Sequence, residues 1–395
     1  MIRSIKSFDL RGQTILMRLD LNVPMHNEKI EDDFRIRSCL PTINFCLAAG
    51  ASIVIMSHLG RPKGRYNPNY SLMPVGENLA ALLEIPIKFS EDCVSQDAID
   101  TSLSLKAGEV HLLENLRFYK EEQENDPEFS SKLSRHGKLF INDAFGTAHR
   151  KHSSNFGVVS SFKYYGIGLL FEKELQYLKR IMNKPKKPLV VLLGGAKAST
   201  KIELIKNYLH VADKILIGGG MAFTFFKALG YNIGKSLIEE TMVKNARSII
   251  DLARASDKEL IFPLDVICSK SLSDLPIKNA VDVREISDDV MGLDIGPKSI
   301  RLFNQLLNGS STVIWNGPMG VFENDAYSNG TKLIAENLSK ITDDGVCVIA
   351  GGGDTSSALK HFNLLEKLTH VSTGGGSSLE LMSGKSLIAL ERLEV

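Results

Sequence analysis

A succession of short apolar segments, each followed by a polar or glycine-rich turn and then a helical stretch, restricts the fold of this chain more than any other feature. Val, Ile and Leu dominate these segments, as expected of parallel strands that are buried on both faces of a sheet. The predicted strands cover residues 14–17, 52–56, 110–113, 138–141, 189–193, 214–217, 312–315, 346–350 and 369–372. The pattern predicts an α/β fold of two doubly wound parallel-sheet, Rossmann-like domains joined by a helical hinge.

The length of the chain and a segment rich in proline and lysine indicate two domains. The chain has 395 residues, more than one hydrophobic core usually supports. A boundary is expected after a charged helix predicted over residues 171–182, because residues 183–188 hold two prolines and three lysines. Further helices are predicted over residues 33–49, 127–136 and 237–255. Asp126 and Pro127 would open the second of these, and a capping box of Ser236 and Glu239 would open the third.

Charge and cysteine usage narrow the possible partners. Lys and Arg total 47 against 46 Asp and Glu, a formal net charge of +1, so no excess charge is present to hold nucleic acid or an anionic membrane. The five cysteines have neither zinc-site nor disulfide spacing and are expected to be buried thiols. The N-terminal residues do not resemble a secretory leader, and the longest apolar run, residues 215–226, is too short for a bilayer. We expect a soluble, cytoplasmic protein whose partners are small molecules.

Basic side chains follow the predicted strands of the first half. Arg18, His58 with Arg61, Arg117, and His149 with Arg150 come at or just after successive strand ends. Because the ligand crevice of an open parallel sheet lies outside the carboxyl ends of its strands, these side chains should converge there and suit a small polyanion. Arg35, in the first turn of a predicted helix, opposes the helix dipole and should either pair with the nearby aspartates or reach an anion.

Glycines follow the predicted strands of the second half. The glycine-rich turns begin at residues 194, 218, 317, 351 and 374. Such turns let backbone N–H groups approach a phosphate without side-chain clash. A basic crevice and a glycine-lined crevice together suit phosphoryl transfer from a nucleotide to an anionic partner. No acid and base pair is evident, as expected when the acceptor is a carboxylate or phosphate with no proton to remove.

The turn over residues 351–355 is the most informative of these. Three glycines and Asp354 follow an apolar strand, and a helix is expected to open at Thr355 with its positive dipole end at the turn. Asp354 has two interpretations, an ordinary N-cap or a hard oxygen ligand for Mg²⁺ held by nucleotide phosphates, and one side chain can serve as both.

With these motifs in order, the chain resembles the phosphoglycerate kinase family from near its start to near its end. The resemblance rests on residues 18–24, 57–62, 114–118, 142–150, 194–197, 317–323, 351–355 and 372–376. It implies reversible transfer of a phosphoryl group between ATP and the carboxylate of 3-phosphoglycerate, giving 1,3-bisphosphoglycerate and ADP, with Mg²⁺, in glycolysis. Residues 198–200 depart from the Val-Ser-Asp that is usual in relatives, whereas Lys197 and Lys201 are retained.

The resemblance assigns roles to individual residues. Those implied to bind 3-phosphoglycerate are Asp20, Asn22, Arg35, His58, Leu59, Gly60, Arg61, Arg117 and Arg150. Those implied to surround the nucleotide are Gly195, Lys201, Gly219, Gly292, Leu293, Asn316, Pro318, Glu323, Gly351, Gly352, Gly353, Asp354 and Thr355, with Asp354 also on Mg²⁺. Arg18 is expected at the reacting carboxylate. Arg18, Lys197 and the backbones of Gly353 and Gly375 are expected to stabilise the group in transfer.

The implied organisation is a 3-phosphoglycerate-binding domain over residues 1–168, a connecting helix and hinge over 169–186, a nucleotide-binding domain over 187–376, and a C-terminal segment, 377–395, that returns to the first domain. A monomer is expected. Two alternatives stay open. One is another acyl-phosphate-forming kinase, because the sequence shows an anion site without its dimensions. The other is a non-catalytic nucleotide-binding protein on the same fold, which the presence of both Arg18 and Lys197 disfavours.

Overall fold

Two compact units make up the chain. The computed structural model describes residues 2–394, and the side chains of all of these except residues 180 and 183. The first unit comprises Met1–Gln176 and Lys385–Val395, and the second comprises Tyr177–Gly384. Helix α6 (Leu169–Asn183) runs along the chain from the first into the second.

The first unit is built on a six-stranded sheet with the strand order β5-β6-β4-β1-β7-β8 and parallel pairing throughout. Its strands are β1 (Thr14–Arg18), β4 (Ser52–Met56), β5 (Ile87–Ser90), β6 (Val110–Leu113), β7 (Leu139–Asn142) and β8 (Tyr165–Ile167). A two-stranded hairpin, β2 (Met25–His26) with β3 (Lys29–Ile30), lies outside the sheet. In register, Arg18 at the end of β1 faces Met56 of β4 and Asn142 of β7, so the three strands end at one edge.

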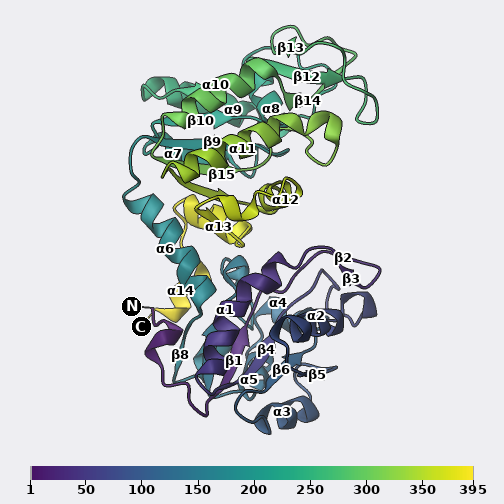
Figure 1. Ribbon diagram of the computed structural model, residues 1–395, viewed down its shortest axis with the longest axis vertical. Helices are drawn as coiled ribbons and strands as arrows, with labels where there is room; N and C mark the ends of the chain where they lie inside the picture. Colours follow the sequence, from purple (N-terminus) through teal and green to yellow (C-terminus); the bar gives the residue numbers. More distant parts are fainter. Residues whose placement is uncertain (1, 395) are drawn as a thin grey trace. The chain divides into compact units, whose positions relative to one another are not determined.

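Helices connect these strands. They are α1 (Phe34–Ala48), α2 (Met73–Leu83), α3 (Gln96–Leu103), α4 (Lys120–Glu124), α5 (Pro127–Ser134) and α14 (Ile388–Leu393), with short 3₁₀ turns η1 (Ile5–Ser7), η2 (Pro68–Tyr70), η3 (Leu116–Phe118), η4 (Phe145–Thr147) and η5 (Gly157–Ser161). The prediction that Asp126 opens the helix at Pro127 is confirmed, because its side chain accepts the Phe129 N–H at 2.8 Å. Helix α14 lies beside β8 (Figure 1), and the Ala389 N–H donates to the Ala148 carbonyl at 3.0 Å.

The second unit has a six-stranded parallel sheet with the order β11-β10-β9-β15-β16-β17. Its strands are β9 (Leu189–Leu193), β10 (Lys214–Ile217), β11 (Leu260–Ile261), β15 (Thr312–Asn316), β16 (Cys347–Gly351) and β17 (His370–Val371). Counted along the chain this is the order 3-2-1-4-5-6 of dinucleotide-binding folds, and the direction of winding reverses between β9 and β15. The prediction of doubly wound parallel sheets is confirmed.

The helices of this unit are α7 (Ile202–Leu209), α8 (Met221–Ala228), α9 (Val243–Ala255), α10 (Pro297–Asn308), α11 (Asn329–Asp343), α12 (Gly353–His361) and α13 (Gly376–Met382), with 3₁₀ turns η6 (Glu240–Met242), η7 (Asp325–Tyr327) and η8 (Leu365–Lys367). Helices α8 and α9 pack on each other, as do α10 and α11. A three-stranded antiparallel sheet, ordered β13 (Val281–Asp282), β12 (Asp265–Ser269), β14 (Met291–Ile295), was not predicted. It lies at one end of the unit (Figure 1).

Two predicted helix starts are wrong. The helix expected over 237–255 begins at Val243, after a 3₁₀ turn, and has no side-chain cap. Ser236 instead accepts the Gly292 N–H at 2.9 Å, and Glu239 accepts from Ser199, so neither residue forms the predicted capping box. The helix expected to open at Thr355 begins at Gly353, with Gly352 as N-cap at φ +99°, a backbone conformation that favours glycine.

A chain of hydrogen bonds is buried between α3, β6 and His136, the second residue after α5. Ser102 Oγ lies 2.9 Å from His111 Nδ1 and 2.7 Å from His136 Nδ1. The far ring nitrogens reach Ser90 Oγ at 2.8 Å and the Cys93 carbonyl at 3.1 Å. The Cys93 carbonyl accepts only, so a neutral His136 donates there and its Nδ1 must accept. That nitrogen shares the Ser102 hydroxyl proton with the Ala98 carbonyl, which lies 3.0 Å from Ser102 Oγ, and Ser102 in turn accepts from His111. All four ring nitrogens of His111 and His136 thus have a partner while both rings are neutral. Burial lowers the pKa of each histidine to about 4.

This chain predicts a defined dependence of stability on pH. The folded-state pKa of His136 lies below its ordinary 6.5, so the stability contributed by the neutral ring is complete above pH 6.5 and is lost as pH falls toward 4. We expect the free energy of unfolding of the wild type minus that of His136→Gln, from urea titrations followed by circular dichroism, to fall by about 3 kcal/mol between pH 7 and pH 4.

The matched control is His26→Gln, which removes an exposed ring in the same unit. Its difference from the wild type at each pH gives the baseline against which the change for His136→Gln is measured. A difference for His136→Gln that changes with pH no more than this baseline would contradict the neutral hydrogen-bond chain.

Candidate functional site

Basic side chains gather at the carboxyl edge of the first sheet. Arg18 ends β1, His58 follows β4, Arg117 lies in η3 after β6, and Arg150 follows η4 after β7. Burial lowers the pKa of each of the three arginines, and positive neighbours lower it further. For Arg117, where Arg150 and Arg18 are those neighbours, the pKa is about 10. The predicted convergence of these side chains is therefore present in the structure, and the cluster is poised for negative charge.

Arg18 lies beneath this cluster and is 1% exposed. Its Nε donates to Ser154 Oγ at 2.8 Å, its Nη1 donates to the Leu19 carbonyl, and its Nη2 lies 3.1 Å from His58 Nδ1. Burial lowers the pKa of Arg18, while Glu122 and Asp20 act in the opposite direction. All three guanidinium nitrogens thus have protein partners, and the predicted contact of Arg18 with a reacting carboxylate stays a prediction.

The sequence left open whether Arg35 pairs with an aspartate or reaches an anion, and its contacts answer this question in part. Arg35 pairs with Asp20, at 3.1 Å between Nη1 and Oδ2. The same Nη1 donates to the Asn22 carbonyl at 3.2 Å, and Asn22 Oδ1 accepts the Gly60 N–H at 2.8 Å. The Arg35 side chain is 29% exposed, so it keeps open donors at the rim of the cluster.

Arg150 and Arg117 offer donors inside the cluster. Arg150 Nη1 is buried without a hydrogen-bond partner among the described residues, whereas Nε lies 3.3 Å from His149 Nε2. Arg117 Nη1 donates to the Gly60 carbonyl at 2.6 Å. Burial of an unsatisfied guanidinium nitrogen is costly, so Arg150 Nη1 marks a place where an anion would be stabilised. Arg61 is exposed.

Three residues of this site were not predicted. Asn115 holds the loop after β4: its Oδ1 accepts the Leu59 N–H at 3.2 Å and its Nδ2 donates to the Leu59 carbonyl at 2.8 Å. Glu122 and Ser154 lie behind Arg18, and Glu122 is completely buried. Asn115 shares the strand-end position that identified Arg117, but nothing in the acidic run around Glu122 distinguishes it from a solvated helix surface.

The second unit contains a cavity of about 450 Å³ at the carboxyl edge of its sheet. Of the residues predicted around a nucleotide, Gly195, Gly219, Gly292, Leu293, Pro318, Glu323 and Asp354 line it. Lys201, Asn316, Thr355 and the three glycines 351–353 do not. The cavity therefore brings together residues from β14, from the turns after β9, β10 and β15, and from the first turn of α12.

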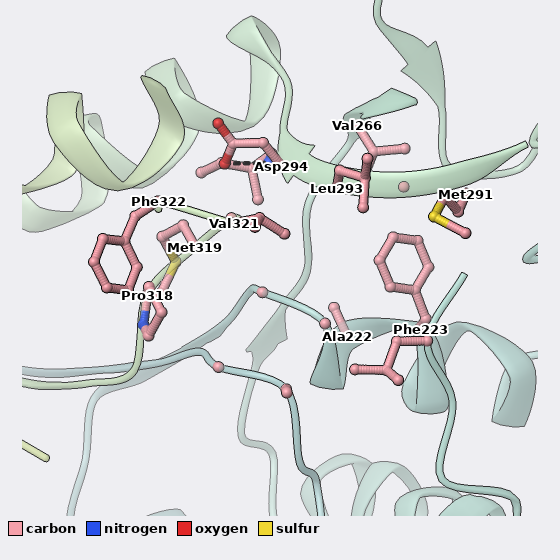
Figure 2. A pocket seen from close by; sticks show the side chains of 18 of the residues that line it. Ala222, Phe223, Val266, Met291, Leu293, Asp294, Pro318, Met319, Val321 and Phe322 are labelled. Atoms are coloured by element: carbon pink, nitrogen blue, oxygen red, sulfur yellow. Dashed lines mark hydrogen bonds between the residues drawn. The ribbon is translucent and has the colours of Figure 1, made fainter. Parts of the chain in front are cut away.

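The inner part of the cavity is apolar, which the sequence did not reveal. Figure 2 shows the ring of Phe223, from α8, facing Met291 and Leu293 of β14, with Met319, Val321 and Phe322 on the opposite wall. Gly292 keeps this space open, since a Cβ there would lie 2.2 Å from Phe223 Cζ. A flat aromatic group suits a slot between such walls.

Asp294, a polar residue on the β14 wall of the cavity, was also not predicted from the sequence. Its carboxylate accepts the Ile295 N–H at 2.8 Å (dashed in Figure 2) and the Gly330 N–H at 2.6 Å. It is 4% exposed, and burial raises its pKa to about 7. The side chain ties β14 to the start of α11 and so fixes one wall of the cavity.

The polar end of the cavity is formed by backbone at the point where the sheet reverses its winding. Gly194 donates its N–H to the Asn316 carbonyl at 2.9 Å, and Gly195 donates to the Pro318 carbonyl at 2.7 Å. A Cβ on Gly317, at φ +98°, would lie 2.3 Å from the Gly194 carbonyl oxygen. Only glycine permits this approach of the two turns.

Asn316 and Thr355 have structural contacts that explain their absence from the cavity lining. Asn316 Nδ2 donates to the Gly351 carbonyl at 2.7 Å. Thr355 Oγ1 accepts the Gly317 N–H at 2.7 Å and donates to the Gly351 carbonyl at 2.8 Å. Both side chains hold the Gly351–Gly353 turn against the turn after β15, which leaves Gly353 and Asp354 exposed at the start of α12.

Two lysines lie in the loop after β9, and Glu239, just before η6, holds that loop in place. Lys197 is exposed, whereas Lys201 is 8% exposed, and burial lowers its pKa to about 8 while Asp354 acts to raise it. Glu239 accepts the Ser199 N–H at 2.8 Å and the Ser199 hydroxyl at 2.7 Å, which fixes the loop that carries both lysines. Gly375, the remaining predicted donor, precedes α13 at φ +48°, with open space around it.

The site offers a carboxylate suited to a Mg²⁺ ion that is bound together with a nucleotide. Among residues 2–394 no group of three or more His, Cys, Asp or Glu side chains could hold a metal ion. Mg²⁺ commonly binds through one carboxylate and the phosphates of a nucleotide, and the exposed Asp354 near Lys201 fits that mode. The N-cap interpretation of Asp354 is wrong, because Gly352 occupies the N-cap and Asp354 lies in the first turn.

The predicted catalytic set is divided between the units, with Arg18 in the first and Lys197, Gly353 and Gly375 in the second. Four of the five cysteines are buried and Cys347 is half-buried. Within the described part of the chain, no helix has the length and apolar character required to cross a bilayer.

Comparison with known proteins gives one family throughout. The family described as phosphoglycerate kinase matches residues 5–385. The phosphoglycerate kinases of Chlorobium phaeovibrioides and Borrelia hermsii are each 45% identical to this chain over 393 residues, which cover 99% and 100% of it and 99% of each relative. The structures of phosphoglycerate kinase from Coxiella burnetii and Pyrococcus horikoshii each give a TM-score of 0.87, at 37% and 31% identity, covering 100% of this chain and 99% and 98% of theirs.

The close approach of Gly292 to Phe223 predicts a selective loss of nucleotide binding in Gly292→Ala. The added methyl group must displace the ring into the apolar part of the cavity, and overpacking of this kind costs about 1–3 kcal/mol. We expect ADP affinity, measured by calorimetry, to fall roughly tenfold or more. Gly309→Ala is the control, because its Cβ would meet nothing closer than the Leu306 carbonyl oxygen at 3.8 Å. Equal affinities of the two variants would exclude this cavity as the base site.

Proposed function

The chain belongs to the phosphoglycerate kinase family, a family of phosphotransferases, and from this premise we propose that it transfers a phosphoryl group reversibly between Mg²⁺-bound ATP and the carboxylate of 3-phosphoglycerate. The observation that carries the proposal is the buried arginine cluster of the first unit, in which Arg150 Nη1 has no protein partner. Such a cluster gains most from an anion with several oxygens. By resemblance we also propose that the protein is a cytoplasmic monomer.

Binding of 3-phosphoglycerate is assigned to this cluster and its rim. Arg150 and Arg117 would hold the phosphate, with Arg61 exposed beside them. Arg35, His58, Asp20 and Asn22 would orient the remainder, with the backbone of Leu59 and Gly60 held in place by Asn115 and Asn22. Burial and the surrounding arginines hold the pKa of His58 well below its usual range, so the ring is a neutral donor and a poor base. A carboxylate acceptor has no proton to give up, so no base is required.

The nucleotide is assigned to the cavity of the second unit. Its base would lie between Phe223 and the wall formed by Val321 and Phe322, with Glu323 toward the ribose. Its phosphates would lie at the glycine turns, near Lys197, Lys201 and the exposed backbone of Gly353. Mg²⁺ bound with the nucleotide, and held here by Asp354, would neutralise charge on the phosphates.

Stabilisation of the group in transfer is assigned to fixed charges and N–H donors. The transition state spreads negative charge over the equatorial oxygens, so preorganised cations stabilise it more than the ground state. Lys197 and the N–H groups of Gly353 and Gly375 are the donors of the second unit. Arg18 belongs to the first, where its buried guanidinium would act by its charge and through His58. In-line transfer requires both substrates to meet with water excluded, and we propose a hinge motion for this step.

The direct test is a coupled assay on the purified full chain. We expect ATP consumption that depends on 3-phosphoglycerate and on Mg²⁺. Other small phosphorylated carboxylic acids should be poorer acceptors. Absence of turnover with 3-phosphoglycerate, in protein shown to be folded, would contradict the proposed function.

The unsatisfied Arg150 nitrogen predicts opposite effects of Arg150→Met on stability and on substrate binding. Removing a charge that depresses the pKa of Arg117 should leave the melting temperature unchanged or higher. Loss of charge-assisted hydrogen bonds worth about 1.5–3 kcal/mol should raise the KM for 3-phosphoglycerate roughly tenfold to a hundredfold, with little change in the KM for ATP.

Arg135→Met removes an exposed arginine, bonded to Gln96 at 3.0 Å, from the same unit and serves as the control. It should leave both KM values as they are in the wild type. If Arg150→Met changed the two KM values equally, the assignment of Arg150 to 3-phosphoglycerate would have to be abandoned.

A further inference from the structure

A buried polar chain runs behind the basic cluster of the first unit, and two of its residues, Glu122 and Ser154, have no role in the function proposed so far. Glu122, on α4, is completely buried, as is Ser154. Glu122 Oε2 accepts the Ser154 N–H at 2.9 Å and Oε1 accepts the Ser154 hydroxyl at 2.6 Å. Ser154 Oγ in turn accepts the Arg18 Nε–H at 2.8 Å. The chain continues from Arg18 Nη2 to His58 Nδ1 at 3.1 Å.

Every link of this chain has a fixed direction. A guanidinium group only donates, so Ser154 Oγ must accept from Arg18 and direct its own proton to the acceptor Glu122. For the same reason His58 Nδ1 must accept from Arg18, and a neutral His58 then carries its proton on Nε2. His58 Nε2 has no hydrogen-bond partner among residues 2–394. The proton on Nε2 is therefore available to a ligand.

We infer that Glu122 and Ser154 are positioning residues for the proposed phosphoglycerate site. They hold the Arg18 guanidinium in the orientation that selects the Nε2–H tautomer of His58 and thereby presents an N–H donor to a substrate oxygen. Without that orientation His58 Nδ1 could carry the proton, and the ring would turn an acceptor lone pair toward an anion. The part of this inference that concerns substrate rests on the proposed function, and the part that concerns the tautomer does not.

Simple charge neutralisation is the competing explanation, since Glu122 is the largest of the charges that stabilise the charged form of Arg18. The two explanations differ at Ser154. If Glu122 acted by charge alone, the serine hydroxyl between them would be dispensable. If the chain sets geometry, removing the hydroxyl breaks it while both charges stay in place.

The chain offers a matched pair of variants, because Ser153 is also completely buried. Ser153 Oγ donates to the Glu121 carbonyl at 2.9 Å and has no bond to Arg18. Ser153→Ala and Ser154→Ala therefore remove the same hydroxyl from adjacent buried positions, and only the second interrupts the chain. The melting temperatures of both variants report any general loss of packing.

The first measurement is the His58 tautomer in the substrate-free full chain, from ¹⁵N–¹H long-range correlation spectra, with the signals assigned by their loss in His58→Gln. We expect the Nε2–H tautomer in the wild type and in Ser153→Ala, and a mixture of tautomers in Ser154→Ala. An unchanged tautomer in Ser154→Ala would overturn the inference. This outcome does not depend on activity, so it is separate from a failure of the proposed function.

The second measurement is steady-state kinetics. Ser154→Ala should raise the KM for 3-phosphoglycerate about tenfold, the effect of one lost hydrogen bond in a site of this kind, with the KM for ATP unchanged. Ser153→Ala should leave the KM for 3-phosphoglycerate at the wild-type value. A shifted tautomer with an unchanged KM, or an equal rise of KM in both variants, would overturn the link between the buried chain and substrate binding.

Discussion

Repulsion between buried guanidinium groups is the constraint on which the first unit depends. Burial lowers the pKa of both Arg18 and Arg117 from its ordinary value, and neighbouring arginines lower it further. Two carboxylates, Glu122 below and Asp20 at the rim, offset part of that cost and hold two of the arginines in place. The compensation is incomplete, as the unpartnered Arg150 nitrogen shows. The protein thus retains an unfavourable charge arrangement that the proposed anionic substrate would relieve, a common exchange of stability for function.

The proposed nucleotide site of the second unit has a different physical basis. Its cavity has few charged side chains, and the reversal of winding between β9 and β15 instead brings two glycine turns into contact. Parallel strands place all such turns at one edge, so the same topology supports an arginine cluster in one unit and a backbone-lined cavity in the other. Strand topology therefore fixes where each site lies, and the residues after each strand fix what it binds.

Sequence reasoning succeeded where one physical signal dominates. Strands 52–56, 110–113, 189–193 and 214–217 have the predicted bounds, because a strand buried on both faces is apolar throughout and ends sharply. The antiparallel strands β12 and β14 were missed because they mix polar with apolar residues, and β13 because it has only two residues. Ser236 and Glu239 carry the spacing of a helix cap but bond across the fold, to Gly292 and Ser199. Glu122 sits in a charged run whose burial only tertiary structure reveals.

The glycine turns at the carboxyl edge of the second sheet have a consequence for how such an enzyme can change over evolution. At Gly194, Gly219 and Gly317 a methyl group would lie within 2.5 Å of neighbouring backbone, so these positions admit no side chain. These turns, of which Gly219 lines the cavity, are therefore closed to gradual variation. The opposite walls, formed by Phe223, Met291 and Phe322, consist of side chains that can exchange for others of similar volume. Under the proposed nucleotide assignment, a shift of preference from one nucleobase to another would be accessible through those walls, while the proposed phosphate contacts of the glycine turns would stay constant.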